Sequence, residues 1–212
     1  MTVRMMEQFG VTVKKEADGS YLIPAGQKYR AGEYLIEPDM SAAAYFYALA
    51  AVLGVKVSVK GVTDHMLQGD TAFLDLLEQM GCIIDRSAEN IIVQGPKYGK
   101  LKGGFTVDMS AFSDQALTLA AIAPFADAPI TITGIGHIRL QECDRIHAIA
   151  HNLNALGIQV YEKEAEVTIY PGAVHGGDVE TFDDHRVAMS FALAGLRTEG
   201  VSILNPSCCK KT

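Results

Sequence analysis

The chain has 212 residues, of which 49% are apolar and 20% charged, so it can fold around a core without disulfide or metal staples. The formal net charge of −7 argues against a general nucleic-acid binder, because such proteins need a broadly basic face. No apolar stretch approaches the roughly eighteen residues of a membrane-spanning helix, and the N-terminus lacks the layout of a signal peptide. We therefore expect a cytoplasmic, monomeric protein with no nucleic-acid or membrane partner.

The cysteines are expected to be reduced thiols. They show no CxxC spacing and two of them are adjacent: Cys82, Cys143, Cys208 and Cys209. This pattern favours neither a disulfide framework nor a zinc site. No other feature of the sequence indicates a metal, a nucleotide or a prosthetic group, so no cofactor is expected.

The chain opens with an amphipathic helix that ends at Gly10 and is followed by two β-rich runs joined by a polar turn. Similar helices end at Gly81 and Gly157, and the three glycines are 71 and 76 residues apart. Glycine is the usual residue just after a helix. The sequence therefore predicts three copies of an α-β-β unit.

A second set of segments fills the gaps between these copies. Strand-like runs at 33–38, 105–110 and 178–183 each lead to an aspartate that opens an alanine-rich helix, and an alternating strand follows each helix. The aspartates are Asp39, Asp114 and Asp184, spaced 75 and 70 residues apart. These helices are apolar almost all round, so we expect them to be buried. The whole repeat is β-α-β-α-β-β, which makes the fold class α+β.

Complete units occupy about 33–95 and 103–173, and a third begins at about 178. The chain thus opens with the αββ tail of one unit and closes after the βαβ head of another. Two interpretations follow: the tail completes the head in space, or the chain is a piece of a longer repeat protein. The periodicity alone does not decide between them.

Charged residues concentrate where strands run into helices. In the loop from His137 to Arg145, Asp144 is expected to cap the next helix, and the arginines could form weak surface ion pairs. However, a cation at position 145 works against the helix dipole. Arg145 would be misplaced in the first helical turn unless an anionic partner compensates it.

Two other joints carry similar groups. Asp184 is expected to cap its helix, which leaves Arg186 at the mouth of a buried helix, where a guanidinium suits a carboxylate or phosphate. Asp114 occupies the same place in the middle unit, where a capping role is the commoner one, and Asp39 is expected to be a cap. Because the repeat places these joints alike, acids and cations could converge on one face. A serine nucleophile is disfavoured, since no serine lies in a G-x-S-x-G turn.

The combination of ECDRI at 142–146 and DDHR at 183–186, together with EPDMSAAAYF, SDQALTLAAIAPFA and NPSCCKKT, resembles the 5-enolpyruvylshikimate-3-phosphate synthases (3-phosphoshikimate 1-carboxyvinyltransferases). The resemblance implies a two-domain enzyme of about twice this length, with three βαβαββ units in each domain, an inside-out α/β barrel. It implies that residues 1–30 are the αββ tail of a missing N-terminal domain. Residues 31–212 would form the C-terminal domain, whose last unit, 178–212, is truncated.

The resemblance also implies a reaction: the enolpyruvyl group of phosphoenolpyruvate moves to the 5-hydroxyl of shikimate 3-phosphate, and phosphate is released. It implies that Asp114 is the base toward that hydroxyl and that Glu142 handles protons at the methylene carbon. His137 would contact shikimate 3-phosphate. The cations for phosphoenolpyruvate would be Arg145, Arg186 and Lys211.

One residue departs from the family pattern. The family commonly has lysine directly before the glutamate of the ExDR loop, where this chain has Gln141. An amide keeps hydrogen-bonding capacity but lacks the charge, so we expect a weaker or water-mediated contact with substrate. Two alternatives stay open: an enolpyruvyl transferase acting on UDP-N-acetylglucosamine, and a binding module of the same fold without chemistry. We expect the isolated chain to be inactive without the missing domain.

Overall fold

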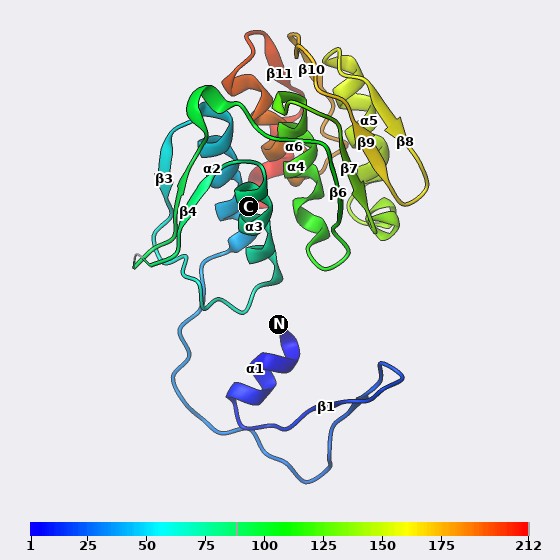
Figure 1. Cartoon of the computed structure of the whole chain (residues 1–212). Coiled ribbons are helices and arrows are strands. Elements are labelled where there is room, and N and C mark those ends of the chain that lie inside the picture. The colour runs from blue at the N-terminus through cyan, green and yellow to red at the C-terminus, as the bar shows by residue number, and fades with distance from the viewer. Residues whose placement is uncertain (88, 212) are drawn as a thin grey trace.

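Three alanine-rich helices lie at the centre of the structure, a computed structural model that describes residues 1–87 and 89–211. They are α2 (Met40–Leu53), α4 (Ala116–Ile122) and α6 (His185–Ala192), and α4 contacts both of the others (Figure 1). Every residue of α4 is buried, as are most residues of α2. The prediction that these helices are interior is confirmed for α2 and α4, whereas only four of the eight residues of α6 are buried.

The second unit shows the complete order of elements. Strand β6 (Phe105–Asp108) pairs in parallel with β7 (Ile130–Thr133), and α4 connects them. Helix α5 (Arg145–Ala155) then leads into the hairpin of β8 (Val160–Glu162) and β9 (Val167–Ile169), and β9 pairs with β7. The sheet order is therefore β6-β7-β9-β8, with a parallel pair on one side and an antiparallel hairpin on the other.

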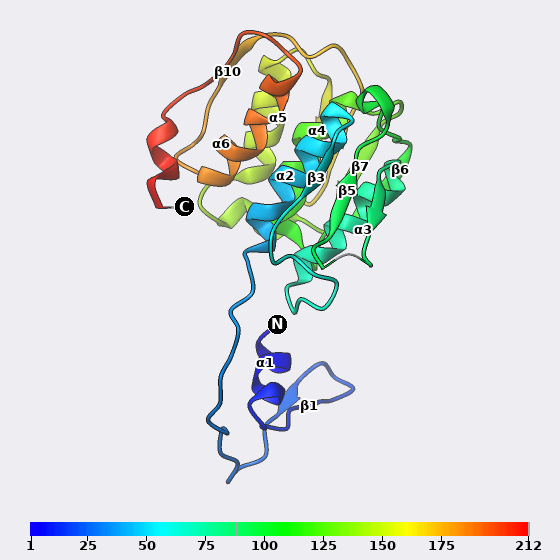
Figure 2. The ribbon, with the colours of Figure 1, turned by 90° about the vertical axis from the view of Figure 1, so that its left-hand side faces the viewer.

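The first and third units repeat parts of this order. In the first, β3 (Lys56–Ser58), β4 (Ile83–Asp85) and β5 (Ile92–Gln94) form a sheet of order β3-β5-β4, and α3 (Ala72–Gln79) lies between β3 and β4 in the chain. In the third, β10 (Gly177–Val179) pairs in parallel with β11 (Val201–Ile203) around α6. The sheets lie outside the central helices (Figures 1 and 2). The α+β fold of repeated βαβαββ units is confirmed.

The strand predicted at 33–38 is wrong. This segment has no strand assignment, and Leu35 and Ile36 are 91% and 83% exposed. In the other two units the corresponding strand pairs with the strand after the alanine-rich helix, whereas β3 keeps an open edge. The segment instead crosses from the N-terminal residues to the start of α2, where no neighbouring strand supplies backbone hydrogen bonds (Figure 2).

Residues 1–38 form an arm that stands apart from the rest of the structure (Figures 1 and 2). We call that rest, residues 39–87 and 89–211, the head. The arm contains α1 (Thr2–Gln8) and an antiparallel pair, β1 (Lys14–Lys15) with β2 (Tyr21–Leu22). No residue of α1 is buried, and Tyr21 and Leu22 are exposed. The arm has the predicted αββ order but no βαβ partner of its own to cover its apolar side chains.

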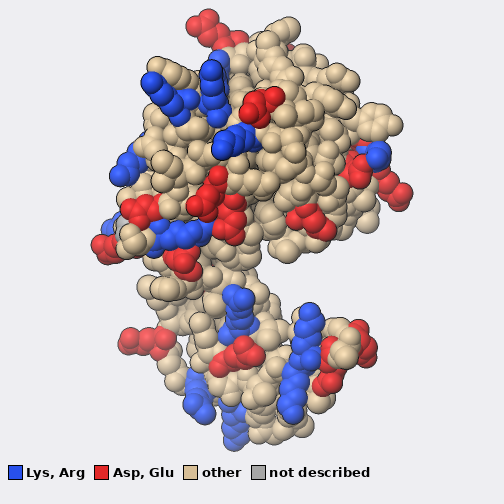
Figure 3. Space-filling model, in the orientation of Figure 1, with Lys and Arg blue, Asp and Glu red and all other residues tan. Residues whose placement is uncertain are grey.

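Charges are dispersed over the surface. On the face shown in Figure 3, acidic and basic side chains are interspersed on both the arm and the head. No helix in the described part of the chain is both long and apolar enough to span a bilayer.

We predict that Gly95→Ala destabilises the head. A Cβ atom at this position would lie 1.9 Å from the carbonyl oxygen of Ala50 in α2, so β5 and α2 would have to separate. Overpacking of this kind typically costs about 1–3 kcal/mol. Urea unfolding of the variant should show this loss, whereas Gly32→Ala, where a Cβ meets open space, should unfold like the parent. Equal stability of both variants would contradict the packing described here.

Candidate functional site

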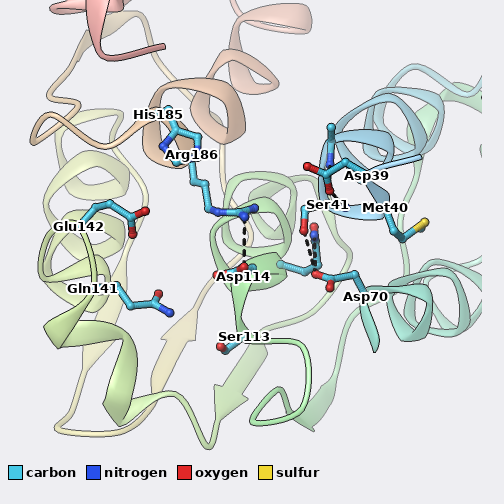
Figure 4. Close-up of polar contacts among 12 residues, drawn as sticks. Asp39, Met40, Ser41, Asp70, Ser113, Asp114, Gln141, Glu142, His185 and Arg186 are labelled. Atoms are coloured by element: carbon cyan, nitrogen blue, oxygen red, sulfur yellow. Dashed lines mark hydrogen bonds and ion pairs between the residues drawn. The ribbon is translucent and has the colours of Figure 1, made fainter. Parts of the chain in front are cut away.

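Three charged joints, two from the second unit and one from the third, meet at one end of the head, where the helices begin (Figure 4). Asp184 precedes α6, Asp114 lies in the 3-10 turn Ser113–Gln115 before α4, and Glu142 lies just before α5. Each comes from a different helix start, yet all three carboxylates contact one side chain, that of Arg145. The predicted convergence of the joints on one face is confirmed.

Arg145 lies in the first turn of α5 with only 1% of its side chain exposed. Its Nε donates to Asp184 Oδ2 at 2.8 Å, its Nη1 to Asp114 Oδ1 at 3.0 Å, and its Nη2 to Glu142 Oε2 at 2.7 Å. Nη1 also donates to Gln141 Oε1. Burial opposes the charged guanidinium, but these partners outweigh it and raise the pKa of Arg145. A cation in the first turn of a helix is unfavourable, and here three carboxylates of the same chain compensate the charge of Arg145.

Asp184 is the fully buried partner, with 0% of its side chain exposed. Its Oδ1 accepts from the backbone N–H of Arg186 at 2.8 Å, so the predicted N-cap of α6 is confirmed. Burial favours the protonated acid, yet the hydrogen bond and charge of Arg145 prevail and lower the pKa of Asp184. The thiol of Cys143 donates to the same carboxylate at 3.6 Å. One side chain therefore both starts α6 and neutralises Arg145.

Asp114 does not cap its helix, so that interpretation of Asp114 is wrong. No capping bond from its side chain is found, because it lies inside the 3-10 turn. Its Oδ1 pairs with Arg145 and its Oδ2 with Arg186 Nη2 at 3.1 Å. Asp39 and Asp144 do cap α2 and α5, as predicted. Asp114 is instead held between the guanidinium groups of Arg145 and Arg186, of which Figure 4 shows that of Arg186.

Solvent reaches the acids but not the central cation. The side chains of Asp114 and Glu142 are 36% and 38% exposed, and that of Arg186 is 18% exposed. A ligand approaching this end of the head would therefore meet two carboxylates and the Arg186 guanidinium. Two carboxylates offer acid–base chemistry, and a guanidinium fork offers bidentate binding of a carboxylate or phosphate.

The remaining predicted residues lie at the edge of this cluster. His137 Nε2 is 2.8 Å from Ser113 Oγ, so it contacts the residue before Asp114. Gln141 contacts Arg145 from the loop before α5. The side chain of Lys211 lies outside the described residues, so its predicted place in the site stays a prediction. Arg139 pairs with Asp144 and Glu162, which agrees with the surface ion pairs expected for the arginines of this loop.

Sequence reasoning missed a second polar cluster beside the first. Asp70 accepts from Ser41 Oγ at 3.2 Å and from Gln115 Nε2 at 3.0 Å, which links the start of α2 to the turn that carries Asp114 (Figure 4). The repeat contained the signal: Asp70 follows Asp39 by 31 residues, as Arg145 follows Asp114. Among the described residues no three His, Cys, Asp or Glu side chains are grouped to hold a metal ion.

Comparison with known proteins identifies the family. A sequence model described as EPSP synthase (3-phosphoshikimate 1-carboxyvinyltransferase) matches residues 1–212. The chain belongs to the EPSP synthase family. A 3-phosphoshikimate 1-carboxyvinyltransferase of Nostoc punctiforme is 47% identical over 212 residues, which are 100% of this chain and 49% of that protein. One of Methanosphaerula palustris is 39% identical, again over 100% of this chain and 49% of its own length.

Solved structures agree with this placement. The EPSP synthase of Acinetobacter baumannii superposes with a TM-score of 0.79 at 29% identity, and the match covers 96% of this chain and 49% of that one. The enolpyruvyl transferase NikO of Streptomyces tendae shares the fold, with a TM-score of 0.73 at 21% identity over 98% of this chain and 49% of NikO. The chain thus spans about half the length of the EPSP synthase relatives it matches.

We predict that Asp184→Asn strongly destabilises the head. The substitution removes the charge of Asp184, the fully buried carboxylate that pairs with Arg145. Breaking a buried ion pair typically costs about 3–5 kcal/mol. Asp64→Asn is the matched control, because Asp64 pairs with Arg86 on the surface, where an ion pair contributes at most about 1 kcal/mol. Urea unfolding at neutral pH measures both. A loss below 1 kcal/mol for Asp184→Asn would contradict the central role of this pair.

The stability difference between the parent and Asp184→Asn should shrink in acid. The folded-state pKa of Asp184 is lowered, so its contribution is fully present above the unfolded carboxyl pKa of about 3.9. That contribution is lost as the pH falls through the lower folded value, because Asp184 then takes up its proton. Urea midpoints from pH 6 down to pH 2.5 should therefore converge. A pH-independent difference would show that Asp184 is not ionised in the folded protein.

Proposed function

We propose that this chain supplies the C-terminal part of an enzyme that transfers the enolpyruvyl group of phosphoenolpyruvate to the 5-hydroxyl of shikimate 3-phosphate. The observation that carries the proposal is the pairing of two partly exposed carboxylates, Asp114 and Glu142, with the buried guanidinium of Arg145. The names of the relatives support the same reaction. A cytoplasmic location is part of the proposal.

The reaction needs two proton transfers at each of two steps. In the addition, the hydroxyl oxygen bonds to C2 of phosphoenolpyruvate, the hydroxyl loses its proton, and the methylene carbon C3 gains one. In the elimination, C3 gives up a proton, the C2–O bond to phosphate breaks, and the leaving phosphate takes up the proton that the hydroxyl lost, so that hydrogen phosphate is released. We assign the hydroxyl proton to Asp114 and the C3 proton to Glu142, because both are solvent-accessible and pair with the same guanidinium from two different helix starts.

The two arginines take different roles in this proposal. Arg186 is partly exposed at the start of α6 and has Asp114 as its ion-pair partner, so it can turn its guanidinium to the phosphate or carboxylate of phosphoenolpyruvate. Arg145 is buried and already donates to three carboxylates, so we assign it to positioning Asp114 and Glu142. Lys211 would add a further cation, and His137 and Gln141 would contact the sugar phosphate.

The other half of the enzyme is part of the proposal. The relatives are about twice as long, and the head exposes its acids at one end. We propose that residues 31–212 are the C-terminal domain and that 1–30 belong to the domain that this chain lacks. The exposed apolar side chains of the arm, including Tyr21, Leu22 and Leu35, would then be covered by that domain.

The chain should release phosphate only together with that domain. We expect none from the 212-residue chain alone, and release from the chain assembled with the uncovered half of the Nostoc punctiforme relative when both substrates are present. Asp114→Asn and Glu142→Gln should each lower kcat by about 100- to 10,000-fold, since each removes a proton-transfer group. Asp64→Asn, on the surface, should leave turnover unchanged.

The outcomes separate the alternatives. Phosphate release by the chain alone would refute the need for a second half. An assembled complex that turns over UDP-N-acetylglucosamine in place of shikimate 3-phosphate would assign the other transferase activity. A stable complex that binds both substrates without turnover, or whose activity survives Glu142→Gln, would refute the assigned chemistry.

A further inference from the structure

Two exposed histidines lie on the outer side of α5. His147 and His151 are four residues apart in the helix, so their side chains stand one above the other on the same face. Their ring centroids are 6.0 Å apart, and the His147 side chain is 57% exposed. Arg145 is buried two residues earlier, and residues two apart on a helix point to nearly opposite sides. The histidine pair is therefore separate from the carboxylate cluster around Arg145.

A carboxylate orients one ring of the pair. Glu162, in the neighbouring strand β8, has its Oε2 3.9 Å from Nδ1 of His147, and its Oε1 accepts from Arg139 at 2.8 Å. When Nδ1–H points at this carboxylate, the lone pair of the neutral imidazole lies on Nε2. Histidines that bind metals usually direct their other ring nitrogen at a carboxylate or carbonyl in this way. The contact thus prepares Nε2 of His147 to act as a ligand.

The second ring shares an aromatic neighbour with the first. Phe182 packs edge-on against both imidazoles, with its ring centroid 6.1 Å from that of His147 and 5.4 Å from that of His151. Within the described part of the chain, the ring nitrogens of His151 have no hydrogen-bond or ion-pair partner. These nitrogens are therefore available to a ligand, while Phe182 limits how far either ring can turn.

A single metal ion can join the two rings after a small movement. Metal–imidazole bonds are about 2.0–2.1 Å long, and two of them at about 90–110° place the ring centres about 4.5–5 Å apart. From 6.0 Å the rings must approach by about 1 Å, and exposed side chains make such adjustments readily. Two histidines with the same spacing on a helix bind zinc in the H-E-x-x-H metalloproteases. The spacing on α5 is therefore compatible with chelation by both rings.

The donor atoms select the kind of ion. Magnesium and calcium need oxygen ligands, and soft ions prefer thiolates, whereas two imidazole nitrogens suit divalent ions late in the first transition row. Within that row a nitrogen site binds copper most tightly, and nickel and zinc less so. The ion pairs beside His147 join two carboxylates, Asp144 and Glu162, to one guanidinium, Arg139, which leaves a net charge of −1. That charge favours a cation.

We propose that His147 and His151 form a bidentate surface site for divalent copper, in which Glu162 orients His147. Water fills the other positions of the ion, since no third His, Cys, Asp or Glu side chain of the described residues completes the group. This site departs from the expectation of no metal, which gave no weight to the histidines of α5. It goes beyond the proposed function and does not depend on it.

The probe is copper(II) iminodiacetate titrated into the full chain, because this chelator leaves neighbouring positions open for two further ligands. We expect one ion per chain by calorimetry and two imidazole nitrogens in the electron paramagnetic resonance spectrum. His147→Gln and His151→Gln should each weaken binding by at least about 10-fold, because chelation is lost. Glu162→Gln should weaken it by about 10-fold. His65→Gln is the matched control: His65 is also exposed but lies outside α5, so this variant should bind as the parent does.

A second probe separates the histidines from the thiols. Thiols reduce copper(II) but not nickel(II), so nickel(II) nitrilotriacetate is titrated in the same way, and binding that both histidine variants lose supports the site. Circular dichroism checks that each variant is folded, and the spectrum of the parent chain needs no variant. Full copper binding by folded His151→Gln, a spectrum with only one imidazole nitrogen, or no binding at millimolar probe would each overturn the proposal. Unchanged affinity in Glu162→Gln would refute the orienting role of that carboxylate.

Discussion

The buried pair of Arg145 and Asp184 is the constraint on which the charged end of the head depends. Removing two ions from water is costly, and the cost is met here because the guanidinium donates to three carboxylates and Asp184 also caps α6. Neither group can move without leaving a buried charge unpaired. The pair therefore fixes the start of α5 relative to the start of α6, and through Asp114 it reaches the turn before α4.

This arrangement explains how one cation can serve two acids that must remain exposed. Asp114 and Glu142 each give one oxygen to Arg145 and keep part of their surface in solvent. Because the guanidinium is planar and its donors form a rigid fork, the two carboxylates hold a fixed separation. Lysine could supply the same charge at position 145 but not this geometry. Arg186, which is less buried, is the cation that a ligand can reach directly.

The sequence predicted what depends on local pattern and missed what depends on distant neighbours. The buried alanine-rich helices, the caps Asp39 and Asp184, and the need of Arg145 for an anion follow from periodicity and from the helix dipole. Asp114 departs from its predicted capping role because a 3-10 turn, decided by tertiary contacts, precedes α4. Segment 33–38 contains residues that favour strands, but strands need a partner, and the fold places none beside it.

The repeat also shows how similar units come to hold different chemistry. Asp70 follows Asp39 by the same number of residues as Arg145 follows Asp114, and each lies at or just before the second helix of its unit. In the first unit the acid accepts hydrogen bonds from neutral donors, Ser41 and Gln115, and no buried charge arises. In the second unit the cation gathers carboxylates from three joints. The start of α5 tolerates such divergence because Asp144, and not Arg145, caps that helix. A single position in the repeat therefore separates a hydrogen-bond cluster around an acid from a cluster of carboxylates around a buried cation.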